Sequence, residues 1–108
     1  MLRALFFGMP AVILILGLPL AFRWVPPNRL YGFRTATTFS SLDAWYQINF
    51  ATGVALVAAG VLSGVAVVLL AYDVIALKPE ARYLTGILLT GLLLIASLTP
   101  VALYSNRF

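Results

Sequence analysis

The side chains best suited to bind a charged or polar partner gather in the segment from residue 24 to residue 45. Arg29 and Arg34 alternate there with two aromatic residues, Tyr31 and Phe33. Arginine pairs bidentately with phosphate or carboxylate, and aromatic rings sit well at the depth of lipid headgroups. The segment could therefore dock an anionic headgroup or a peptide carboxylate. The same residues could also serve only as a membrane anchor, and both interpretations stay open.

Prolines and a glycine shape the backbone of this segment. Pro26-Pro27 favours an extended start, because each proline ring fixes φ. Gly32 permits a positive φ or a close approach of the backbone to another group. We therefore expect the segment to fold onto the membrane surface rather than to act as a simple linker.

Three residues spaced four apart, Trp45, Asn49 and Gly53, follow directly. Residues at this spacing share one face of an α-helix. Asn49 carries donors and acceptors that hydrocarbon cannot satisfy, so its side chain should point at the helix bundle or at the preceding segment. Backbone groups of Arg34 or Thr35 are suitable partners. Asn49 is then either a structural hydrogen-bonding residue or a direct ligand contact.

Catalysis and metal binding are poorly supported by the composition. The 108 residues include no Cys and no His, which removes thiolate and imidazole chemistry. None of the three acidic residues lies within an apolar run, so a proton-coupled exporter would lack its membrane-embedded carboxylate. We expect no enzyme activity, no cofactor and no metal.

Hydropathy identifies the elements that must position these residues. Hydrophobic residues make up 63% of the chain and charged residues 9%, with a mean hydropathy of +1.05, unlike a soluble domain. Three uncharged runs, 4–22, 44–72 and 83–106, are long enough to cross a bilayer. We predict an all-α integral membrane protein with three transmembrane helices, at about 3–22, 42–72 and 82–105. One structured interfacial loop, 23–41, joins the first two helices within a single domain, 1–108.

Local signals refine the helix ends. Pro10 and Pro19 each remove a backbone donor, so the first helix should kink near Pro10 and stop or bend near Pro19. Ser40 with Asp43 three residues later resembles a capping box, which predicts a second helix starting near Ser41. The second apolar run exceeds the roughly 20 residues of a straight crossing, so this helix must tilt or begin outside the hydrocarbon core.

The basic residues favour lipid as a partner but do not settle the orientation. The net charge of +4 arises from seven Lys and Arg residues that lie scattered beside the apolar runs. This distribution matches membrane lipids and does not indicate nucleic-acid binding. Three basic residues flank the helices on the N-terminal side and four on the other. Because three against four decides nothing under the positive-inside rule, the orientation stays open.

Small residues on the second helix predict close helix packing. Gly60 and Gly64 form a small-xxx-small pair, and Gly53 lies seven residues before Gly60. This stripe could pack against the first or third helix of the same chain. It could equally receive a partner membrane protein, or a second copy in a homo-oligomer. An accessory subunit of a larger membrane complex is therefore one function to weigh.

The polar residues of the loop and second helix together carry a family resemblance. The pattern Asn28-x-x-x-Gly32-Phe33-Arg34-Thr35, then Thr38 and Ser40 or Ser41, then Trp45-x-x-x-Asn49-x-x-x-Gly53, resembles the signature of the SdpI immunity-protein family. The chain departs from it at Ala36, where the family often has Pro, and at Phe50, where a basic residue is common. The candidate ligand- or partner-binding residues are Asn28, Arg29, Gly32, Arg34, Thr35, Trp45, Asn49 and Gly53, with Gly60 and Gly64 as helix-packing residues.

The resemblance implies a multi-pass protein of the bacterial inner (plasma) membrane. It further implies immunity to a secreted antimicrobial peptide or sensing of one, and in some members signalling that holds a repressor at the membrane. The implied partners are membrane lipids together with an antimicrobial peptide or a partner membrane protein. Arg34 is the first candidate for recognition, because its planar fork could tie the loop to the second helix or meet an anionic group.

Overall fold

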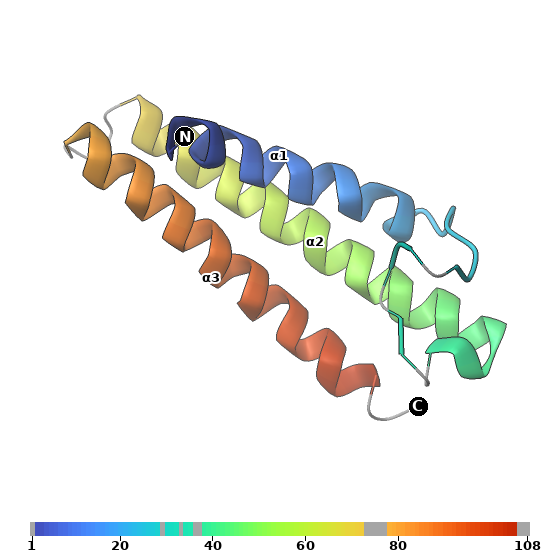
Figure 1. Ribbon diagram of the computed structural model, residues 1–108. Coiled ribbons are helices and arrows are strands. Elements are labelled where there is room, and N and C mark those ends of the chain that lie inside the picture. Colours follow the sequence, from blue (N-terminus) through green and yellow to red (C-terminus); the bar gives the residue numbers. More distant parts are fainter. Residues whose placement is uncertain (1, 29, 33, 36–37, 73–77, 106–108) are drawn as a thin grey trace.

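The computed structural model describes residues 2–28, 30–32, 34–35, 38–72 and 78–105. Its elements are α1 (Leu2–Ala21), η1 (Thr38–Ser40, a short 3-10 helix), α2 (Leu42–Ala71) and α3 (Pro79–Ser105) (Figure 1). The three α-helices are each long and apolar enough to cross a membrane. The predicted all-α fold with three spanning helices is confirmed, and the described part of the chain contains no strand.

The helix ends lie within three residues of the predicted bounds. The largest difference is at α3, which begins at Pro79 rather than near residue 82. Proline suits the first turn of a helix, because that turn has no use for its missing backbone donor. Glu80 adds a negative charge in the same turn, where the helix dipole favours it.

The start of α2 agrees with the prediction, but its capping residue does not. Ser41 is the N-cap, and its Oγ accepts a hydrogen bond from the Ala44 N–H at 3.0 Å. Ser40 lies in η1, so the predicted capping box of Ser40 and Asp43 is wrong. Both carboxylate oxygens of Asp43 instead accept from Nε2 of Gln47, at 2.9 Å. The negative charge of Asp43 still lies in the first turn of the helix.

The end of α1 is a left-handed turn rather than a proline. Pro10 and Pro19 both lie inside the helix. Beyond Pro19, the N–H of Trp24 donates to the Pro19 carbonyl at 3.0 Å, and the N–H of Arg23 donates to the Leu20 carbonyl at 3.1 Å. This pair of bonds is a Schellman motif, and Arg23 has the positive φ, 60°, that the motif requires. The predicted stop near Pro19 therefore falls two residues later.

Glycines let α1 and α2 pack with their backbones in near contact. A Cβ atom on Gly53 would lie 2.2 Å from the backbone nitrogen of Ala21. A Cβ on Gly17 would lie 2.7 Å from a side-chain atom of α2, and one on Gly60 would lie 3.0 Å from Leu14. A larger residue at the first two positions would force the helices apart.

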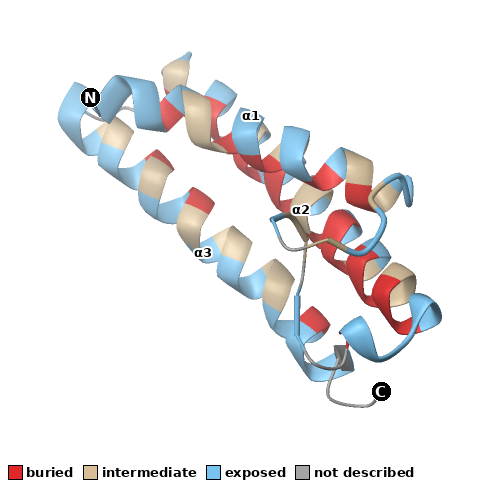
Figure 2. Cartoon of the chain, turned by 45° about the vertical axis from the view of Figure 1, so that its right-hand side comes forward, coloured by how far each residue is buried: buried red, intermediate tan, exposed pale blue. Residues whose placement is uncertain are grey.

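α3 packs less closely than the other helices. In the most apolar stretch of 18 residues, 17% of α3 is buried, compared with 28% of α1 and 33% of α2. The buried positions concentrate where α1 meets α2 (Figure 2). α3 makes apolar contacts near both of its ends, where Val101 joins a cluster with Ala44 and Ile48, and Gly86 lies against the ring of Phe6.

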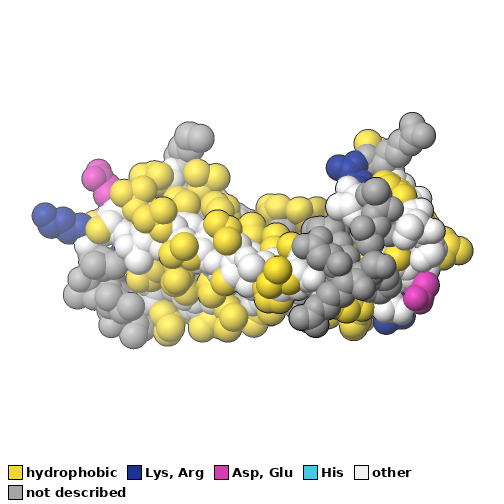
Figure 3. All heavy atoms as spheres, turned by 90° about the horizontal axis from the view of Figure 1, so that it is seen from below, with side chains coloured by type: hydrophobic (Ala, Val, Ile, Leu, Met, Phe, Trp, Pro, Cys, Tyr) yellow, Lys and Arg dark blue, Asp and Glu magenta, His cyan; other side chains and the backbone are white. Residues whose placement is uncertain are grey.

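The outer surface suits a membrane environment. Apolar side chains cover most of the length of the molecule, and charged side chains lie at its two ends (Figure 3). Buried hydroxyls inside the helices are satisfied locally, because those of Thr52, Ser63 and Thr90 each donate to the carbonyl four residues earlier. The spanning segments can thus meet hydrocarbon without leaving these polar groups unpaired.

Candidate functional site

Asn28 organises the first part of the loop. Its Oδ1 accepts hydrogen bonds from the N–H groups of Leu30, at 2.9 Å, and Tyr31, at 2.7 Å. Its Nδ2 donates to the carbonyl of Pro26 at 2.8 Å. These bonds form an Asx-type turn, in which the side chain replaces missing backbone partners. Asn28 therefore shapes the loop from within.

Gly32 carries the loop directly across α2. It has a φ of 115°, a conformation that L side chains rarely adopt. A Cβ atom there would lie 2.8 Å from Oδ1 of Asn49 and 3.3 Å from the ring of Trp45. The backbone conformation and the close approach both require glycine at this position.

Trp45, Asn49 and Gly53 form one face of α2, and each residue fixes a different part of the chain. Trp45 is fully buried, and its Nε1 donates to the carbonyl of Val25 at 2.8 Å. Asn49 is 2% exposed, and its Nδ2 donates to the Trp45 carbonyl at 3.0 Å while its Oδ1 faces Gly32. Gly53 receives the end of α1. We call these three residues the docking face of α2.

Thr35 and Thr38 close the second part of the loop. The Oγ1 of Thr38 accepts from the Thr35 N–H at 2.7 Å and donates to the Thr35 carbonyl at 2.9 Å. The Oγ1 of Thr35 accepts from the Thr38 N–H at 3.2 Å. Thr38 is fully buried, and Phe39 after it stacks on Trp45 with ring centroids 5.3 Å apart. Thr35 is thus a structural residue of the loop as well as a signature residue.

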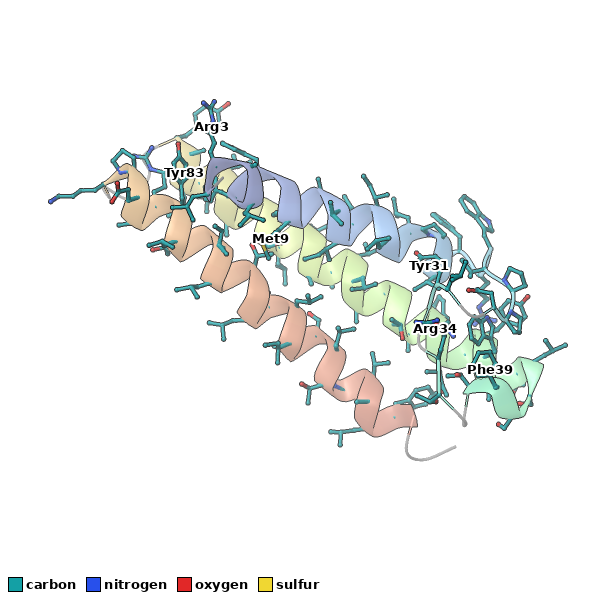
Figure 4. The ribbon with its side chains drawn as sticks, in the orientation of Figure 1. Arg3, Met9, Tyr31, Arg34, Phe39 and Tyr83 are labelled. Carbon is teal, nitrogen blue, oxygen red and sulfur yellow. The ribbon has the colours of Figure 1, made fainter. Side chains whose placement is uncertain are left out.

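Arg34 lies on the outer side of this assembly. Its side chain is exposed, and it shares the loop end of the molecule with Tyr31 and Phe39, far from Arg3 and Tyr83 (Figure 4). The Tyr31 hydroxyl donates to the Leu16 carbonyl and so ties the loop to α1. Partial burial raises the pKa of Tyr31, which keeps the phenol protonated as a donor. The remaining loop candidate, residue 29, lies outside the described residues.

Residues 25–104 match the SdpI/YfhL protein family, a stretch that includes most of the loop, all of α2 and nearly all of α3. The chain belongs to this family. No curated protein and no solved structure matches it. The resemblance drawn from the signature is thereby confirmed. With three membrane-crossing helices, the chain is a multi-pass membrane protein of the SdpI/YfhL family.

The glycines of this SdpI/YfhL chain divide between internal and external surfaces. Gly53 and Gly60 pack against α1, which lies outside the matched residues. A Cβ atom on Gly64 would meet nothing within 4 Å. In the small-xxx-small pair, Gly60 therefore packs against α1 of the same chain, whereas the surface at Gly64 is left uncovered.

A second candidate site lies between α2 and α3 at the loop end. It is a cavity of about 610 Å³, and we call it the α2–α3 cleft. Its mouth holds a chain of hydrogen bonds, because the hydroxyl of Tyr104 donates to Oε1 of Gln47 at 3.0 Å and the amide of Gln47 donates to Asp43. The guanidinium of Arg23 lies over the ring of Phe50, 4.7 Å from its centroid. The lining is Arg23, Asp43, Tyr46, Gln47, Phe50, Ala51, Val54, Ala55, Ser97, Pro100, Val101 and Tyr104.

Sequence reasoning did not identify the α2–α3 cleft as a site. Its polar residues come from three separate helix ends, and Gln47 and Tyr104 are 57 positions apart. No local spacing could have brought them together. Within the described residues, no group of three or more His, Cys, Asp or Glu side chains could hold a metal ion.

Proposed function

We propose that this SdpI-family protein gives a bacterium immunity to an antimicrobial peptide, or senses one, by binding it at the outer face of the loop. One observation carries the proposal: the loop packs against buried residues of α2, and the same loop exposes an arginine side chain. Trp45 and Asn49 are buried under Gly32, whereas Arg34, two residues along, is exposed. A guanidinium on a fixed backbone can bind a carboxylate through two parallel N–H···O hydrogen bonds at little entropic cost. In this proposal the protein binds its ligand and catalyses no reaction.

Exposed apolar side chains on the same loop as Arg34 suit an amphipathic ligand. Leu30 is 91% exposed, Trp24 is 70% exposed and Phe39 is 50% exposed. Such side chains lie favourably at the membrane interface, where amphipathic peptides also insert their apolar faces. A peptide that brings both a carboxylate and an apolar face would satisfy the guanidinium and these three side chains together.

A killing assay tests the proposal. A sensitive bacterium expressing the chain is challenged with secreted amphipathic peptides, each as the free acid and as the C-terminal amide. Arg34→Lys should reduce protection about tenfold or more, the effect of losing one charge-assisted hydrogen bond. Amidation of the peptide should have a similar effect on the wild type. Arg3→Lys, at the opposite end, is the matched control, and membrane-fraction levels must be equal for all variants.

Equal protection by Arg34→Lys and wild type would show that the loop is an anchor and would refute peptide recognition. The immunity proposal also places the protein in the bacterial inner membrane with its loop facing outward. Leu30→Cys should then react with an impermeant thiol reagent in intact cells, and Lys78→Cys should not. The reverse pattern would favour the repressor-holding role, because the loop would face the cytoplasm.

The accessory-subunit function keeps one supporting observation, the open surface at Gly64. This glycine lines an apolar groove with Val61 and Val65. If a partner helix packs there, Gly64→Leu should abolish co-purification of that partner. Gly60→Leu is unsuitable as a probe, because Gly60 already meets Leu14 of α1. Arg34→Lys should leave such a complex intact, which separates the two functions.

A further inference from the structure

The α2–α3 cleft has opposite charges at its mouth and hydrocarbon side chains deeper in. Arg23 and Asp43 line it at the loop end, and Ala51, Val54 and Val101 line it further along. Its volume of about 610 Å³ falls within the range of roughly 300–1,000 Å³ found for small-ligand sites. The cleft is therefore built for an elongated molecule with a charged head and an apolar tail.

Both charges at the mouth can still interact with a ligand. The contact of Arg23 with the Phe50 ring uses the face of the guanidinium and leaves its in-plane N–H groups available as donors. Asp43 accepts from the neutral amide of Gln47, which orients the carboxylate without cancelling its charge. A carboxylate has further acceptor positions for a cationic donor. One head with a negative and a positive group would complement the pair.

The length of the cleft suits a lipid head followed by the start of a tail. From Asp43 to Ala55 the lining follows α2 over twelve steps of the helix, about 18 Å at 1.5 Å per residue. Arg23 follows the end of α1, which lies against Gly53, and its guanidinium lies over Phe50, so it is further along α2 than Asp43. The apolar lining at Ala51, Val54 and Val101 continues beyond Phe50. A head therefore suits the part of the cleft near Asp43 and Arg23, and a tail suits the apolar part.

We propose that the α2–α3 cleft binds one bilayer phospholipid of the phosphatidylethanolamine class. Its phosphate meets Arg23, its ammonium donates to Asp43, and one acyl chain lies along Ala51, Val54 and Val101. Phosphatidylglycerol carries no cation for Asp43. Phosphatidylcholine carries a cation that has no N–H donor. This assignment is independent of peptide recognition by the loop.

Lipid retention tests the assignment on the full chain. The detergent-solubilised protein is mixed with equal amounts of phosphatidylethanolamine, phosphatidylglycerol and phosphatidylcholine with identical acyl chains, and bound lipid is measured by native mass spectrometry. The wild type should retain about threefold more phosphatidylethanolamine than either competitor, as one partly exposed ion pair would give. Asp43→Asn should abolish this preference. Arg23→Asn should lower retention of all three lipids, and Asn tolerates the left-handed φ at that position.

A pair of matched substitutions tests whether the lipid lies in the cleft. Val54→Phe should fill it and reduce retention of all three lipids at least threefold, as expected if it removes most tail contacts. Val61→Phe is the control, because Val61 lies on the same helix and is 50% exposed, compared with 47% for Val54, but lies outside the lining. Helix content by circular dichroism should be unchanged in both variants.

Three outcomes would overturn the proposal. The wild type could retain the three lipids equally, Asp43→Asn could keep the preference, or Val54→Phe could retain as much lipid as Val61→Phe. A photo-crosslinker at position 54 that captures a second copy of the chain, with no lipid retained, would also overturn it. The cleft would then be a contact between chains.

Discussion

The two sides of α2 are packed in opposite ways. Towards α1, glycines bring the backbones together, and a Cβ atom on Gly53 would lie 2.2 Å from the Ala21 nitrogen. Towards α3, branched and aromatic side chains leave a cavity of about 610 Å³, crossed at its mouth by the hydrogen bond from Tyr104 to Gln47. We refer to these as the closed side and the open side of α2.

The difference separates two mechanical roles. The loop is fastened to the closed side, because Gly32 crosses Trp45 and Asn49 while the end of α1 lies on Gly53. A surface built there has little freedom to rearrange, which suits recognition by a fixed shape. The open side has room for a ligand and fewer buried contacts, so α3 can adjust its distance from α2 with less loss of packing energy.

The largest effect on stability should come from adding one methyl group where α1 packs against α2 on the closed side. Gly53→Ala places a Cβ atom against the backbone of α1, which cannot move as a flexible side chain would. Overpacking of this kind costs about 1–3 kcal/mol, and we expect about 3 kcal/mol here because backbone atoms are the obstacle. The measurement is the free energy of unfolding in mixed detergent micelles.

Gly64→Ala is the matched control for that substitution. It lies on the same helix, and its new methyl group would meet nothing within 4 Å. Replacing glycine by alanine in an unobstructed helix stabilises by roughly 0.5–1 kcal/mol. The two variants should therefore differ in opposite directions from the wild type. If the two variants are equally stable, the close backbone contact between α1 and α2 does not determine the stability of the closed side.

A smaller but more local effect is expected from Asn49→Leu. The change keeps a side chain that branches at Cγ but removes the donor to the Trp45 carbonyl and the acceptor beneath Gly32. An unsatisfied buried group costs about 1–3 kcal/mol, and here the loss should detach the loop without disturbing membrane insertion. The emission of Trp45 should shift to longer wavelength, and protection against peptide should be lost.

Thr52→Val provides the comparison for Asn49→Leu. It removes a buried hydroxyl on the same helix whose only described bond is to the Ile48 carbonyl. Because none of the described loop residues depends on that bond, the loop should stay attached and protection should persist. Loss of protection in both variants would mean that general destabilisation, and not attachment of the loop, causes the phenotype.

The closed side was largely predictable from sequence, and the open side was not. Trp45, Asn49 and Gly53 recur at helical spacing, so their shared face follows from local geometry. Spacing could not tell that Gly60 packs internally while Gly64 stays open, because the distinction depends on where α1 crosses. Thr38 belonged to the signature, but its complete burial depends on how the loop folds back over α2. The cleft depends on the path of α3, which hydropathy does not specify.

The open side should respond more weakly to removal of its bridging bond. Tyr104→Phe deletes the donor to Gln47 and should cost about 1 kcal/mol, a typical value for one hydrogen bond. The distribution of distances between spin labels on α2 and α3 should broaden at the loop end. Labels on α1 and α2 should show no change. Broadening on both sides would contradict the separation into a closed and an open side.

The smallest effect concerns the tie between the loop and α1, and it depends on pH. The Tyr31 hydroxyl donates to the Leu16 carbonyl, and burial raises its pKa in the folded state above the unfolded value of about 10. The protonated phenol therefore stabilises the fold fully below about pH 10, and this contribution is lost as the pH rises through the folded pKa. Tyr31→Phe should lower stability by less than about 1 kcal/mol at pH 8. The difference from wild type should shrink over the interval that starts at the unfolded value, about 10, and runs upward through the raised folded pKa of Tyr31. A difference that stays constant over that interval would show that the hydroxyl does not hold the closed side together.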